Sequence, residues 1–361
     1  MPLPSHSTDV RCPETQPPLL ILMKQKTWPC KSDSPHVIAL PFIRKPQTSS
    51  NFTKSYKIYL SYFTSKPNPP SSLFKSPDFS ELPYDVLARI TASFTFPDLR
   101  AASLVCRAWR DALKPLREAM VFLKWGKRFK HGRGGMKANL SKALDSFLKG
   151  AARGSTLAMV DAGLIYWELG RREEGISWYR RAAELGDPAG QCNLALSYLQ
   201  ANPPNTKEAI EWLHRASIAG HVRAQYQLAL SLHQGRGVKQ SLQAAARWYL
   251  RAAEGGYVRA MYNTSLCYSL GEGLAQSHRL ARKWMKRAAD RGHSKAQFEH
   301  GLGLFSEGEM LKAVVYLELA TRSGERAAAP VKNVILQQLS SSSFNRAMFL
   351  ADNWRALPST S

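Results

Sequence analysis

The feature that most constrains the fold of this 361-residue chain is a nine-residue phrase that recurs along it. The phrase reads Trp-Tyr-Arg-Arg-Ala-Ala-Glu-Leu-Gly at residues 178–186. Copies stand at 212–220, 248–256 and 284–292, with weaker ones at 146–154 and 316–324. The closing glycines are separated by 32, 34, 36, 36 and 32 residues, and they are Gly154, Gly186, Gly220, Gly256, Gly292 and Gly324. Repeats of this length are typical of helix pairs that bury a continuous core only by stacking, so the period predicts an all-α fold built around an α-solenoid.

Small residues accompany each glycine at fixed distances. Eleven positions before each glycine stand Ala143, Gly175, Ala209, Ala245, Ala281 and Ala313, and four positions after stand Ala158, Gly190, Ala224, Ala260, Ala296 and Ala328. The aromatic residue eight positions before the glycine shares a helical face with the alanine four positions before it and the small residue eleven positions before it, so we expect the aromatic residue to pack between small residues where two helices approach closely. The tryptophans of this series, at 178, 212, 248 and 284, are therefore interpreted as core residues. The glycine itself fits a helix C-terminus, where a positive φ is required.

A shorter module precedes the repeats. Val86, Leu87 and Ile90 are spaced for one face of a short helix, and Pro97-Asp98 marks a new helix start. Apolar residues then continue with helical spacing as far as Trp109. Two or three short helices in about 40 residues make a core too small to be comfortable alone. The module is therefore either a cap on the repeats or a docking unit that a partner completes.

Over residues 80–118 this module resembles an F-box. The resemblance is carried by Leu-Pro at 82–83 and by Leu-Val-Cys-x-x-Trp at 104–109, while the segment Ser-Phe-Thr-Phe at 93–96 departs from the leucine that many members carry. It implies docking on the Skp adaptor of a Skp–cullin–F-box ubiquitin ligase. The positions that match the docking face or the small core behind it are Leu82, Pro83, Ile90, Val105, Cys106 and Trp109.

The repeats are similar to SEL-one-like repeats, which are relatives of tetratricopeptide repeats. The similarity rests on the pattern A-x-x-W-[YL]-x-[RK]-A-A-x-x-G-x-x-x-A-Q-x-x-L and on Gly-x-Gly turns at 235–237 and 271–273. Pentatricopeptide RNA-binding repeats have a similar length but lack this signature. The whole chain thus resembles a plant-type F-box protein with SEL-one-like repeats. We expect a disordered, basic Ser/Pro-rich tail at 1–77, the F-box at 78–120, a linker helix and leading half-repeat at 121–153, the repeats at 154–324, and a capping helix and tail at 325–361.

Nothing in the sequence indicates catalysis. The glycine runs lack the Lys-Ser/Thr of a phosphate-binding loop and recur in register with the repeats. The histidines are scattered, and no pair at i, i+4 has a carboxylate to complete a metal site. The five cysteines form no C-x-x-C pair, which favours a reducing compartment, and no apolar run approaches the length of a membrane span. We expect no enzyme activity, no cofactor, no metal and no membrane insertion.

The chain carries a formal charge of +23, which predicts attraction to anionic partners. The tail at 1–77 holds 10 basic and 3 acidic residues and too little apolar surface to fold, although its few acids also fit a transit peptide. A second basic stretch, Lys124 to Arg133, interleaves aromatic residues with cations. That pattern fits a nucleic-acid patch, but we favour an amphipathic linker helix that buries Phe122, Trp125 and Phe129.

A client groove is expected from the tetratricopeptide-like architecture, in which the first helix of each pair lines the concave face. By that resemblance, the position seven residues after each glycine points into the groove, flanked by an aromatic row and by a cation one helical turn earlier. The candidate residues are Asn193, Arg223, Tyr226, Gln227, Arg259, Tyr262, Asn263, Lys295 and Phe298. They would offer amides, cations and aromatic anchors to a peptide. Equally, the amides could bond the neighbouring backbone and the cations could be solvated.

These features favour a substrate-recognition subunit of a Skp–cullin–F-box ubiquitin ligase. The F-box would bind the Skp adaptor, and through it the cullin, while the repeats would bind an unknown client protein in the cytoplasm or nucleus. The alternative is a repeat scaffold or RNA-associated protein without a ligase role. Nucleic acid is not the partner that we favour.

Overall fold

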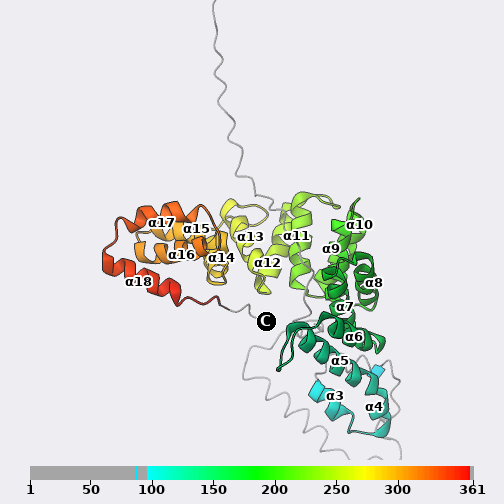
Figure 1. The fold of residues 1–361 in the computed structure, drawn as a ribbon. Helices are drawn as coiled ribbons and strands as arrows, with labels where there is room; N and C mark the ends of the chain where they lie inside the picture. The colour runs from blue at the N-terminus through cyan, green and yellow to red at the C-terminus, as the bar shows by residue number, and fades with distance from the viewer. Residues whose placement is uncertain (1–85, 88–95, 358–361) are drawn as a thin grey trace, which may run out of the picture.

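The computed structural model describes residues 86–87 and 96–357, and within these ranges all regular structure is α-helical (Figure 1). The prediction of an all-α solenoid is confirmed. None of the described helices has the length and hydropathy that crossing a bilayer requires. The tail that we expect to be disordered, at 1–77, lies outside the described residues.

Three helices begin the described chain: α3 (Phe96–Ala102), α4 (Arg107–Ala112) and α5 (Lys114–His131). Leu87, Leu99, Ala102 and Leu113 form a small core there, and Trp109 packs against it. This cluster is separate from the cores of the repeats, as the short module in the sequence predicts.

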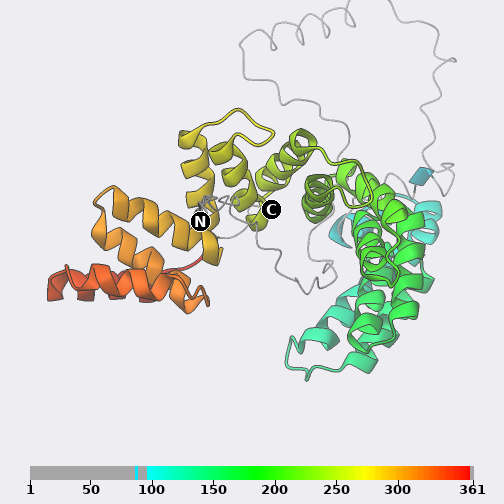
Figure 2. The same ribbon diagram turned by 90° about the horizontal axis from the view of Figure 1, so that it is seen from above.

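The rest of the chain alternates between two sets of helices, most of them of 13 residues. The first helices of the pairs are α5, then α7 (Thr156–Glu168), α9 (Pro188–Gln200), α11 (Val222–Gln234), α13 (Val258–Leu270) and α15 (Ser294–Ser306). The second helices are α6 (Leu140–Ala152), α8 (Arg172–Glu184), α10 (Thr206–Ile218), α12 (Leu242–Glu254), α14 (His278–Asp290) and α16 (Met310–Arg322). Each helix packs on its neighbours in the chain, and the stack curves into the arc that Figure 2 shows from above.

The predicted small residues hold the helices together. Four positions before the glycines, Ala182, Ala216, Ala252 and Ala288 are completely buried, and the alanines four positions after the glycines are buried as well. Each closing glycine has a positive φ, as a helix C-terminus followed by a tight turn requires.

The tryptophans lie less deeply than we predicted. Trp284 is buried, but Trp178, Trp212 and Trp248 are half-buried. In the last three cases the residue that follows fills the core, namely Tyr179, Leu213 and Tyr249. The tryptophan covers the edge of the core instead, where an arginine three residues later lies over its ring.

Helix α5 is more than a linker. It is continuous from Lys114 to His131, and it contributes to the F-box cluster at one end and packs along α6 at the other. Contrary to the prediction, Trp125 is exposed, while Leu123 and Gly126 face the repeats. Gly126 lies directly against the ring of Phe147, and only a glycine fits this close approach.

Two helices, rather than one, follow the last pair: α17 (Ala328–Leu336) and α18 (Ser341–Asp352). Both pack on α16, where Arg322 forms an ion pair of 2.7 Å with Asp352. The chain then turns back, and the Leu357 amide donates to the Asp290 carbonyl at the end of α14 over 2.9 Å.

Candidate protein-interaction surfaces

The F-box helices present an apolar turn to solvent. Leu104 and Val105, between α3 and α4, are 73% and 65% exposed, and Val86 and Phe96 are also exposed. Exposed apolar residues that gather on one small module mark an interaction site. Of the residues that the sequence assigns to adaptor docking, Val105 belongs to this surface, whereas Leu82, Pro83 and Ile90 lie outside the described residues.

Cys106 and Trp109 support that turn from behind. The Cys106 thiol is the N-cap of α4, because its Sγ accepts the Trp109 amide over 3.4 Å. The Trp109 side chain packs on the F-box core. Both side chains are half-buried, so they support the exposed turn and contribute less accessible surface than Leu104 and Val105 do.

Several of the predicted groove residues are buried between helices. Asn193 is 1% exposed, and Tyr226 and Gln227 are buried as well. The Tyr226 ring lies 4.9 Å from that of Tyr257, so it belongs to the core between repeats. Helices α7 and α9 are in contact, which fits the expectation that first helices line the inner side of the arc.

The remaining groove residues, most of which lie nearer the C-terminal end, are more accessible. Arg259 is exposed, and Arg223, Tyr262, Asn263, Lys295 and Phe298 are half-buried. Asn263 is hydrogen-bonded to the side chain of Tyr249. A part of the predicted amide row therefore bonds to the protein itself.

Tyr262 and His293 form a stacked pair at this end, with ring centroids 4.7 Å apart. His293 Nδ1 accepts the Ala296 amide over 3.2 Å and so caps α15. Burial, followed by the nearby charges of Arg259 and Lys295, lowers the pKa of His293 to about 4. Burial also raises the pKa of Tyr262 to about 12. Both rings are therefore neutral at physiological pH.

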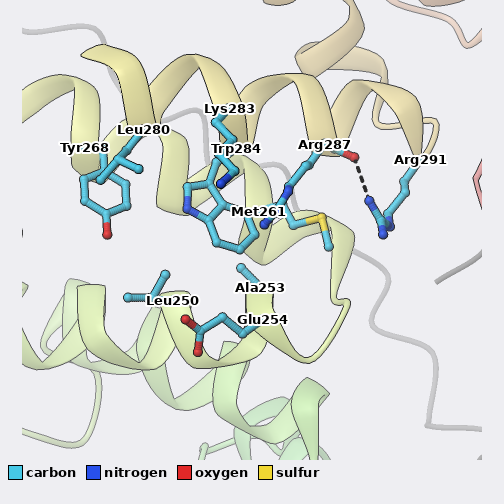
Figure 3. Close-up of a pocket in the computed structure, with 10 residues that line it drawn as sticks. All are labelled: Leu250, Ala253, Glu254, Met261, Tyr268, Leu280, Lys283, Trp284, Arg287 and Arg291. Carbon is cyan, nitrogen blue, oxygen red and sulfur yellow. Dashed lines mark hydrogen bonds between the residues drawn. The ribbon is translucent and has the colours of Figure 1, made fainter. Parts of the chain in front are cut away.

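A cleft that the sequence analysis did not foresee opens between the second helices α12 and α14 (Figure 3). It has a volume of about 540 Å³. Lys283, Arg287 and Arg291 line one side of the cleft, and Glu254 lies on the opposite helix. The other lining residues are mostly apolar, and they are Leu250, Ala253, Met261, Tyr268, Leu280 and Trp284. The sequence carries one indication of this cleft, the excess of basic over acidic residues in α12 and α14, whose equivalent positions lie 36 residues apart.

Arginines cover the tryptophan rings along the second helices. The guanidinium carbon lies 5.7 Å from the ring centroid in the pair at 178 and 181, 4.6 Å at 212 and 215, 5.0 Å at 248 and 251, and 4.7 Å at 284 and 287. Such contacts are worth about 0.5–1 kcal/mol each at exposed sites. They hold the arginine heads in fixed rows at the edge of the core.

Within the described part of the chain, no three His, Cys, Asp or Glu side chains are placed to share a metal ion. The described cysteines, Cys106, Cys192 and Cys267, form no disulfide. Burial raises the pKa of Cys267 to about 12, so its thiol is a packing group rather than a nucleophile.

Family models match both modules. An F-box-like model matches residues 79–116, and the Sel1 repeat model matches 123–155, 158–187, 188–221, 222–257 and 258–293. The first of these repeats begins inside α5 and includes α6.

Relatives and solved structures agree with these matches. F-box protein At1g70590 of Arabidopsis thaliana is 59% identical over 353 residues, which cover 94% of this chain and all of the relative. A protective antigen of uropathogenic Escherichia coli with an SLR fold superposes with a TM-score of 0.57 at 20% identity, covering 75% of this chain and 63% of the antigen. A Sel1 repeat protein of Oxalobacter formigenes gives a TM-score of 0.49 at 24% identity, with 66% of this chain and 96% of that protein covered.

Proposed function

The chain belongs to the family of F-box proteins with Sel1 repeats, and we propose that it is the substrate-recognition subunit of a Skp–cullin–F-box ubiquitin ligase. F-box domains bind Skp adaptors, and the repeats provide a surface for protein–protein interaction. In this role the protein makes and breaks no bonds. It holds a client close to a ubiquitin-charged enzyme that the cullin recruits, in the cytoplasm or nucleus.

The observation that carries this proposal is the exposed apolar turn at Leu104 and Val105 on a module with its own small core. Two adjacent aliphatic side chains in water do not stabilise a monomeric protein. Their burial under a bound adaptor would stabilise the complex by about 1.5–3 kcal/mol for each side chain. The turn is connected to the repeats through α5, so an adaptor bound there leaves the solenoid accessible.

The client would lie along the first-helix face or along the second-helix face of the solenoid. On the first-helix face, Arg259, Tyr262, Lys295 and Phe298 are predicted groove residues that keep accessible surface, and Tyr262 and Phe298 also pack against the repeat cores. We retain these residues as the proposed groove.

Co-purification with a Skp adaptor tests the F-box assignment. A Leu104→Asp/Val105→Asp variant should retain its fold, because both side chains are exposed, and should lose the adaptor and the cullin. The matched control is Ile218→Asp, which changes an exposed aliphatic residue on the repeats and should leave both partners bound.

Recovery of the adaptor with the Leu104→Asp/Val105→Asp variant would contradict the assignment of this turn to the docking surface, and failure of the wild-type chain to recover a Skp adaptor would contradict the proposed function. The net charge of +23 favours one other outcome, in which the wild-type chain recovers RNA in a salt-sensitive manner and no adaptor. That result would establish the scaffold or RNA-associated role instead.

A further inference from the structure

The cleft between α12 and α14 differs in charge from the rest of the second-helix face. Helices α12 and α14 together hold seven Lys or Arg residues and two acidic residues. The equivalent helices of the preceding repeats, α8 and α10, hold five of each. All four helices share the same packing residues, so the fold alone does not account for this concentration of positive charge.

Three of these charges form a row along the cleft. Lys283 and Arg287 of α14, with Arg291 just beyond its end, are spaced four residues apart, so they follow one another at about 6 Å along one face. Among the described residues, Lys283 and Arg287 form no ion pair. By contrast, Arg282 pairs with Glu307 and Lys286 pairs with Asp290 on the other side of the same helix.

The guanidinium of Arg291 is only partly satisfied. Its Nη1 donates to the Arg287 carbonyl over 3.4 Å, as the dashed line in Figure 3 shows, but its Nε is buried without a hydrogen bond. A buried cationic donor without an acceptor is unfavourable, and a carboxylate within reach of this guanidinium would offset that cost.

The lining of the cleft favours a peptide over a nucleic acid. Arg287 lies over the Trp284 ring, which is itself only 7% exposed, so no base could stack on that ring. The accessible apolar lining, with Leu250 and Leu280, is suited instead to an aliphatic or aromatic side chain.

We propose that the cleft between α12 and α14 binds an extended acidic segment of a protein partner, with carboxylates at alternate positions facing Lys283, Arg287 and Arg291 and one apolar side chain against Leu250 and Leu280. Alternate side chains of an extended peptide are about 6.6–7 Å apart, close to the spacing of the cations. That the segment belongs to the client rests on the function proposed above. The cleft itself does not depend on it.

Fluorescence anisotropy on the full-length chain at about 0.15 M salt tests this proposal. The probes are a labelled twelve-residue peptide of alternating Glu and Ser in which one central Ser is replaced by Leu, the same peptide with Lys for Glu, and a labelled oligothymidylate of twelve nucleotides. The variant is Lys283→Glu/Arg287→Glu, and Lys283→Gln/Arg287→Gln serves as a milder second form. The matched control is Lys207→Glu/Lys239→Glu, which makes the same change in charge at two exposed lysines outside the cleft.

Saturable binding of the acidic peptide that is about tenfold weaker in either cleft variant, and unchanged in the control, would support the proposal. Equal losses in the cleft variants and the control would overturn it, because the whole basic surface would then be responsible. Absence of binding to the wild type, or preferential binding of the oligothymidylate that the cleft variants abolish, would also overturn it. Skp binding by the same variants is measured in parallel. Loss of peptide binding with Skp still bound would count against the cleft alone, whereas absence of Skp binding by the wild type would count against the ligase role.

Discussion

At the scale of single residues, the position after each closing glycine shows what the repeat requires and what it tolerates. This residue is the N-cap of the first helix of the next pair, where a side chain can accept a hydrogen bond from the backbone. Ser155 accepts the Ala158 amide, Asp187 accepts two amides, and His221 and His293 accept through Nδ1. Tyr257 caps α13 without a side-chain hydrogen bond, so an acceptor is favoured rather than required, and a neutral imidazole can supply it as a hydroxyl or a carboxylate does.

The cap at His293 makes stability depend on pH. Burial lowers the pKa of His293 to about 4, from an ordinary value of 6.5. Between these values the unfolded chain binds a proton that the folded chain does not, so stability falls as the pH drops from about 6.5 towards 4 and is fully present above 6.5. The effect is on the order of 2–3 kcal/mol at its full extent. Urea unfolding at pH 7 and at pH 5 measures the part lost in that interval.

The serine at position 155 supplies the control for this prediction. A His293→Ser variant keeps an acceptor at the cap and removes the titrating group, so its stability should change less between pH 7 and pH 5 than that of the wild type. A residual slope is expected, because burial also lowers the pKa of His300. If the two proteins lose the same stability over this interval, His293 is not the group responsible.

At the scale of the elements, the Gly-x-Gly turns lock one repeat onto the one before. Arg236, in the turn after α11, donates to the Leu199 carbonyl at the end of α9 over 2.6 Å. On its C-terminal side, Gly237 lies against the backbone of Thr206, where α10 begins. The turn is therefore part of the contact between repeats and not a passive connection.

Two glycines of this turn allow the cost of backbone strain to be distinguished from the cost of close packing. Gly235 and Gly237 have φ of 69° and 73°, so alanine is strained at both. At Gly237 a Cβ would also lie 2.8 Å from the Thr206 carbonyl oxygen, whereas at Gly235 its nearest neighbour is 3.4 Å away. We expect Gly235→Ala to cost about 1 kcal/mol and Gly237→Ala about 2–4 kcal/mol in thermal or urea unfolding. Equal losses would show that strain alone governs this turn.

The helices could be predicted well from the sequence because the same pattern of residues recurs in every repeat. The period gave the helix pairs, and the alanines at fixed distances from the glycines gave the buried contacts between them. The depth of the tryptophans could not be read from the spacing, because Trp178 and Tyr179 are neighbours and either one could face the core. The cleft was missed for a different reason: its cations and its single acid, Glu254, come from helices in separate repeats, and only their packing brings them together.

At the scale of the whole molecule, α5 decides how the two modules are connected. Leu116 and Met120 pack on the F-box cluster, and Leu123 belongs to the first repeat cluster, all within one uninterrupted helix. Arg153, at the end of α6, reaches back to Glu118 over 2.6 Å. A helix shared in this way transmits orientation, so a client held on the solenoid would keep a fixed position relative to an adaptor bound at Val105.

A break in α5 would test whether this helix couples the two modules. Val121 lies between the two sets of contacts on α5 and is exposed, so Val121→Pro should break the helix there without disturbing either core directly. Hydrogen exchange should then show lost protection in α3, α4 and the first half of α5, while helices α7 to α16 keep theirs, because the F-box module is too small to be stable alone. Val121→Ala, which leaves the helix intact, should resemble the wild type. Unchanged protection of α4 in the proline variant would mean that the module folds independently of the solenoid, and rigid coupling through α5 would have to be abandoned.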